Sequence, residues 1–161
     1  MTVVQSDFVS VRERAAALGQ PLPEGLVFLP ENFEKSERGD EMQFRGEATT
    51  VTKILRQAGL PVARLGPDDQ IAFIHNRSHD WALPVIFIGA ELMKQSPDMV
   101  GMVIDLIRDY VIGQFRGTSD KKIKTEIVIE DRARKTYRKF TYEGDPAGLD
   151  ELGRLIKRLK R

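Results

Sequence analysis

Two histidines, an arginine and an aspartate stand together between residues 71 and 81. His75 and His79 are four residues apart, and Asp80 follows directly. Imidazoles at this spacing on a helix can bind one metal ion, and a histidine beside a carboxylate can act as a general base. The cluster His75, His79 and Asp80 is therefore the candidate catalytic site, suited to a metal-dependent hydrolase or nuclease.

The same cluster also has a plainer interpretation as a polar loop. The residues before His75 are typical of a strand that ends inside the cluster, so helical spacing does not apply across it, and Asp80 would cap the next element. A catalytic zinc ion needs a third protein ligand, but the chain has two histidines and no cysteine. We therefore expect no metal and no cofactor, and favour a protein without enzymatic activity over an enzyme.

Basic residues are concentrated in the last quarter of the chain. Residues 1–120 hold 12 Lys and Arg against 17 Asp and Glu, whereas residues 121–161 hold 13 against 7. A basic surface attracts nucleic-acid phosphates, and the interleaved Tyr137 and Tyr142 could stack on bases. The nucleic-acid-binding candidates are Lys122, Lys124, Arg134, Lys135, Arg138 and Lys139. The same charge also suits pairing with the acidic body or with a protein partner.

Residues 82–116 are the most apolar part of the chain. The pattern predicts a helix over residues 84–95 and a second helix that begins after Ser96, although a buried strand at 84–89 has the same apolar signature. The second helix has only a narrow polar stripe. A helix this apolar is either central to the fold or covered by a protein partner or a second copy. The interface candidates are Met99, Val103, Ile107 and Tyr110.

Turn signals and periodicity predict the remaining elements. We expect a first helix capped by Ser6 and ended by Gly19, then a strand at residues 26–29. A β-α-β-β unit follows over residues 42–75, in which the helix ends at a glycine. Residues 121–161 predict a β-hairpin and an amphipathic helix.

These elements predict an α+β fold, with a mixed sheet of about five to six strands packed against the apolar helix pair. We expect a body at residues 1–120 and a basic hairpin–helix module at 121–161, within the same compact domain and joined near residues 117–119. No segment reaches the roughly 20 apolar residues of a spanning helix, and residues 1–19 lack the features of a secretory signal. We therefore expect a cytoplasmic protein without membrane contact.

The strand–turn–strand–Tyr142-Glu143-Gly144-Asp145–helix ending resembles small uncharacterised bacterial proteins that accompany conflict or defence systems. This resemblance covers about a quarter of the chain. It implies an accessory or interaction role and transfers no catalytic residue. We accordingly expect a non-enzymatic bacterial accessory or protein–protein interaction subunit, with nucleic-acid binding and the histidine-based hydrolase or nuclease as alternatives.

Overall fold

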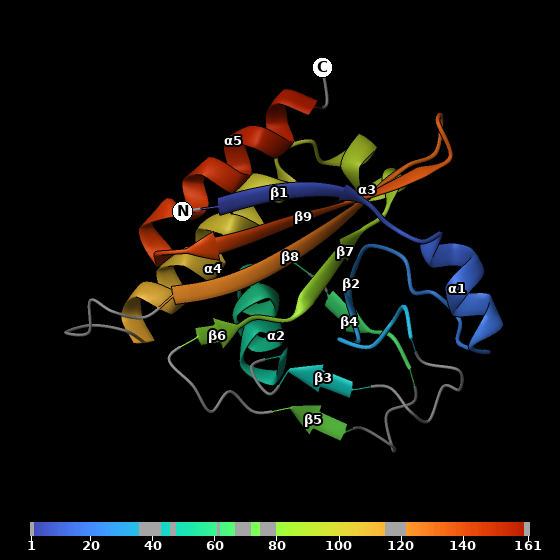
Figure 1. Cartoon of the computed structure of the whole chain (residues 1–161), viewed down its shortest axis with the longest axis horizontal. Coiled ribbons are helices and arrows are strands. Elements are labelled where there is room, and N and C mark those ends of the chain that lie inside the picture. Colours follow the sequence, from blue (N-terminus) through green and yellow to red (C-terminus); the bar gives the residue numbers. More distant parts are fainter. Residues whose placement is uncertain are drawn as a thin grey trace.

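A mixed sheet flanked by helices forms the fold, which confirms the predicted α+β class (Figure 1). The computed structural model describes residues 2–35, 43–45, 48–60, 62–66, 72–74, 80–114 and 122–159. The strands are β1 (Thr2–Asp7), β2 (Leu26–Leu29), β3 (Gln43–Arg45), β4 (Val62–Arg64), β5 (Ala72–Ile74), β6 (Asp80–Ala82), β7 (Val85–Ile88), β8 (Lys122–Asp131) and β9 (Thr136–Gly144). The helices are α1 (Val11–Ala17), α2 (Ala48–Gln57), α3 (Ala90–Gln95), α4 (Met99–Gln114) and α5 (Leu149–Leu159).

The main sheet has the strand order β1-β9-β8-β7-β2-β4, and the short β6 also pairs with β8. The predicted β-α-β-β unit has the right elements, but its last two strands do not pair with each other. Instead, β4 lies parallel to β2, and β5 lies parallel to β3 in a separate two-stranded sheet. Parallel pairing requires a long connection, which α2 provides between β2 and β4.

The centre of the sheet is β7, and the expectation of a helix from residue 84 to 95 is wrong there. All four residues of β7 are buried between β2 and β8, and a helix forms only in α3. The sequence Val85-Ile86-Phe87-Ile88 combines β-branched and aromatic residues, which fit a strand with both faces covered. The alternative of a buried strand at residues 84–89 is the correct one.

The chain starts with a strand, so the prediction of a helix capped by Ser6 is also wrong. Strand β1 pairs with β9 along its whole length, from Thr2 opposite Glu143 to Asp7 opposite Arg138. The helix begins only at Val11, and the Ser10 side chain accepts the N–H of Glu13 at 3.3 Å as its cap. A long partner strand outweighs the helical spacing of the apolar residues in this segment.

The predicted hairpin and final helix are confirmed. Strands β8 and β9 pair without interruption from Ile123–Gly144 to Asp131–Thr136, and Lys135 has a φ of 53° in the tight turn between them. Because β8 also pairs with β7, this module lies in the same sheet as the body. Residues 117–119, expected to be the joint, lie outside the described residues.

Helices α2, α4 and α5 contact one another in a row, and α5 packs on β9. Alternate residues of β9 point to opposite sides of the sheet. Phe140 lies on the side of the sheet that α5 covers, and it lines one cavity together with Ile156 of α5. Tyr137 and Lys139 point to the other side, where α1 and Phe8 lie. Within the described part of the chain, no helix is long and apolar enough to cross a membrane.

Candidate functional site

The predicted catalytic cluster lies mostly outside the described residues. This is the case for His75 and His79, while Asp80 begins β6, in register with Lys122 of β8, and does not cap a helix. Among the residues that the structure describes, no three histidines or carboxylates gather in a way that could hold a metal ion.

The apolar side chains expected at an interface belong to the protein's own core. Met99, Val103 and Ile107 are buried and Tyr110 is half-buried, because α4 packs between α2 and α5. Met99, Val103 and Ile107 therefore pack inside the fold, and an interface at these residues stays a prediction. The exposed apolar residues of α4 are Met102 and Ile112.

The candidate nucleic-acid-binding cations do not form one continuous surface. Lys124 and Lys139 lie 3.3 and 3.5 Å from the carboxylate of Glu126. Lys122 begins β8, about 30 Å from the hairpin turn at roughly 3.3 Å per strand residue. Arg134 and Lys135 lie in that turn, and Arg138 faces the side of α5, opposite to Lys139.

The two tyrosines expected to stack on bases are engaged inside the fold. Tyr142 is buried, and its hydroxyl donates to the carbonyl of Asp145. Tyr137 is half-buried; its ring stacks on Phe87 at 6.3 Å between centroids, and its hydroxyl donates to Glu130 at 2.8 Å. Both tyrosines are thus engaged in contacts within the fold.

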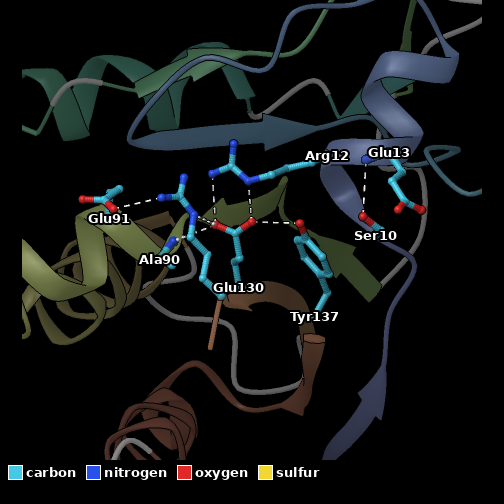
Figure 2. A network of polar contacts seen from close by, with 8 residues as sticks. Ser10, Arg12, Glu13, Ala90, Glu91, Glu130 and Tyr137 are labelled. Carbon is cyan, nitrogen blue, oxygen red and sulfur yellow. Dashed lines mark hydrogen bonds and ion pairs between the residues drawn. The ribbon is translucent and has the colours of Figure 1, made fainter. Parts of the chain in front are cut away.

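Glu130 is a buried carboxylate that joins four elements, as Figure 2 shows. Its side chain lies near the end of β8, and the residue is only 4% exposed. Nε and Nη2 of Arg12, on α1, donate to the two carboxylate oxygens at 2.5 and 3.0 Å. The Tyr137 hydroxyl on β9 and the Ala90 N–H at the start of α3 also donate to this carboxylate. Both oxygens of a buried charge are thus hydrogen-bonded.

These contacts fix the ionisation of Glu130. Burial by itself would raise the pKa of this carboxyl, but the hydrogen bonds from Arg12, Ala90 and Tyr137 stabilise the charged form and lower the pKa to about 2. The hydrogen bond to Glu130 likewise raises the pKa of Arg12 against the opposing effect of burial. Glu130 is therefore a permanent negative charge that holds its neighbours in place, and it is poorly suited to proton transfer near neutral pH.

The local sequence explains why a carboxylate is needed at this point. Helix α3 begins after Gly89, which has no side chain to cap the first N–H groups. The Glu130 carboxylate accepts the Ala90 N–H in place of a capping side chain. Its negative charge also interacts favourably with the positive end of the helix dipole. Arg132 then reaches from the hairpin to Glu91 of α3 at 2.9 Å.

A cavity of about 640 Å³ lies between α3, the end of the hairpin and α5, and we call it the hairpin cavity. This volume is in the range of small-molecule and peptide side-chain pockets. The larger apolar side chains of its lining are Met93, Ile129, Phe140 and Ile156. The charged lining residues are Glu91, Lys94, Glu130, Asp131, Arg132, Arg134 and Arg138.

The charges of the hairpin cavity do not all pair internally. Glu130 is neutralised by Arg12, Glu91 pairs with Arg132, and Arg134 lies 3.9 Å from Asp131. Two cations are left: Lys94 and Arg138 have no ion-pair partner among the residues that the structure describes. The cavity thus offers an apolar wall beside two available positive charges.

Sequence reasoning found only part of this site. Arg134 and Arg138 stand out in the charge pattern of the hairpin, but Lys94 and Arg12 come from distant elements that the chain pattern does not connect. One local feature points to the burial of Glu130: it lies two positions after Val128 and therefore on the same side of β8, where both residues are buried.

A second cavity, of about 320 Å³, lies between α2 and β4. Its arginines are already used by the fold: Arg56 donates to the carbonyl of Val62 at 3.0 Å, and the guanidinium of Arg64 lies 5.5 Å from the Phe44 ring centroid. The hairpin cavity is therefore the better candidate site.

No protein-family model, curated protein or solved structure matches the chain.

Proposed function

We propose that this protein is a non-enzymatic interaction module that binds an acidic segment of a partner protein in the hairpin cavity. One observation carries the proposal: Lys94 and Arg138, which lack ion-pair partners among the described residues, line the same cavity as Met93, Ile129, Phe140 and Ile156. A peptide with a carboxylate next to an apolar side chain would satisfy both parts of this lining.

The chemistry of the lining favours an acidic peptide over a nucleic acid. Nucleic-acid backbones are bound by cations that follow a phosphate track, with aromatic rings on which bases stack. Here the candidate cations are divided between two sides of the sheet, and Tyr137 and Tyr142 are engaged within the fold. An apolar wall with two nearby cations gives a sugar–phosphate chain little to contact.

The Glu130 network supports a binding role in a second way. It fixes the hairpin end against α1 and α3, and so sets the positions of the elements that carry Lys94 and Arg138. A rigid site loses less side-chain and loop freedom when a ligand binds. Since Glu130 keeps its charge and its donors near neutral pH, its role in this proposal is to hold the cavity wall.

Fluorescence anisotropy with a labelled peptide of alternating glutamate and leucine tests the proposal. We expect binding that weakens with salt, is lost with a glutamine–leucine peptide of equal length, and falls at least tenfold in the double variant Lys94→Ala, Arg138→Ala. The matched control is Lys53→Ala with Arg158→Ala, which removes two exposed cations that do not line the hairpin cavity and should change binding less than twofold.

Three outcomes would contradict the proposal. The first is an equal loss of binding in the control variant, because the effect would then follow from net charge alone. The second is stronger binding of a duplex or single-stranded DNA of similar charge, which would favour the nucleic-acid alternative. The third is no detectable binding of the acidic peptide at low salt.

A further inference from the structure

The first strand forms an open edge of the main sheet. Strand β1 is the last strand in the order, so one of its sides pairs with β9 and the other has no strand partner in the described chain (Figure 1). Four consecutive residues, Val4 to Asp7, are exposed, and Val4 is 51% exposed. An open edge presents backbone N–H and C=O groups to which another strand can bond.

This edge lacks the features that usually prevent strand addition. Proteins protect edges with lysine, proline, bulges or very short strands. The six residues Thr-Val-Val-Gln-Ser-Asp contain no lysine, arginine or proline, and their register with β9 runs without a bulge. The opposite edge of the sheet does have such protection, because β4 has three residues and ends with Arg64.

We propose that β1 pairs antiparallel with β1 of a second copy of this chain, so that two sheets join across a twofold axis. A register centred on Val4 places the most exposed apolar side chain of the edge opposite its own copy. Thr2 then lies opposite Ser6, and Val3 lies opposite Gln5. The interface is isologous, as closed dimers require.

The charges of β1 fit this occupant. The one charged residue of the strand is Asp7, at its end. In the register centred on Val4, the two copies of Asp7 lie six strand positions apart, or about 20 Å. Like charges therefore do not meet, whereas lysines along the strand would repel each other in a symmetric pair. Cross-strand pairing of two valines adds a favourable side-chain contact at the centre.

Cysteine trapping tests the pairing, since the chain has no cysteine of its own. In Val4→Cys, the two new thiols would face each other across neighbouring strands and should be joined in most molecules by mild oxidation or by a short bismaleimide. Asp7→Cys is the control: its thiol is on the same exposed strand, but its copy would be about 20 Å away, so cross-linking should be several-fold lower. Equal cross-linking of the two variants would overturn the proposal.

A mass measurement provides the second test. Light scattering after gel filtration should give twice the chain mass at micromolar concentration for the wild type, and the monomer mass for Val4→Lys. Because Val4 is exposed, this variant should keep its fold and its melting temperature. Met102→Lys, which alters an exposed apolar residue of α4, should remain dimeric. A monomeric wild type, or a dimer that Val4→Lys leaves intact, would refute pairing through β1.

Discussion

The carboxylate of Glu130 accepts the backbone N–H of Ala90, 40 residues earlier in the chain, at a distance of 3.0 Å. The acceptor lies near the end of β8 and the donor is the first residue of α3, where Gly89 provides no capping side chain. The Glu130 side chain thus caps the start of α3 from the end of the hairpin. Through its hydrogen bonds with Arg12, it also holds α1 against both elements.

We expect Glu130→Ala to lower the free energy of unfolding by roughly 3–5 kcal/mol, because it leaves the donors of Arg12, Tyr137 and Ala90 without their acceptor. Arg12→Ala should have a comparable effect, also roughly 3–5 kcal/mol, since it leaves the buried carboxylate of Glu130 without its main partner. Urea unfolding followed by circular dichroism measures both. As a control, Glu91→Ala removes an exposed ion pair and should stay within about 1 kcal/mol. Equal effects of Glu91→Ala and Glu130→Ala would contradict this account.

The stability gained from the Glu130 charge should depend on pH. Its pKa falls from the ordinary 4.5 to about 2 on folding, so the unfolded chain binds the proton more readily. This stabilisation is fully present above about pH 5 and disappears as the pH falls towards 2. Unfolding curves between pH 7 and 2 should show that the wild type exceeds Glu130→Gln by a margin that narrows over this window. A margin independent of pH would show that the charge of Glu130 does not contribute.

Two glycines should respond oppositely to alanine. Gly153 lies inside α5, and an added Cβ would meet Ile104 Cδ1 at 3.5 Å, an ordinary contact. Gly153→Ala should therefore stabilise the protein by about 0.5–1 kcal/mol through helix propensity. Gly59 follows α2 with a φ of +84°, so Gly59→Ala should destabilise by about 1 kcal/mol although space is free around it. A higher melting temperature for Gly153→Ala and a lower one for Gly59→Ala, each relative to the wild type, would confirm this. A loss of stability in Gly153→Ala would indicate that α4 and α5 cannot accept the methyl group.

The elements predictable from sequence are those defined by local signals. The hairpin of residues 121–161 follows from the alternation of Ile123 and Ile127 with polar residues, and its helix follows a Gly-Asp-Pro turn. Strand β7 is ambiguous, because a short apolar run fits a buried strand and a buried helix equally. Strand β1 is not evident in the local pattern, because its stability comes from β9, more than 130 residues later.

The candidate site is harder to predict than the fold for the same reason. The charge pattern indicates Arg134 and Arg138, because they stand together on the hairpin. It does not indicate Lys94, since only the connection of β7 to α3 brings that residue beside the hairpin. Nor does it distinguish Glu130, which is buried and hydrogen-bonded, from the exposed Asp131 that follows it.

The pairing of β1 with β9 has a consequence for synthesis on the ribosome. Strand β1 is made well before its partner β9, because Thr2 pairs with Glu143, more than 130 residues later in the chain. Strand β7 is likewise made before its partner β8, and Arg12 is made before Glu130. Contacts this distant in sequence slow folding and leave strand edges open in the growing chain. We infer that the sheet closes only once the hairpin has left the exit tunnel, and that β1 and β7 lack these partners until then.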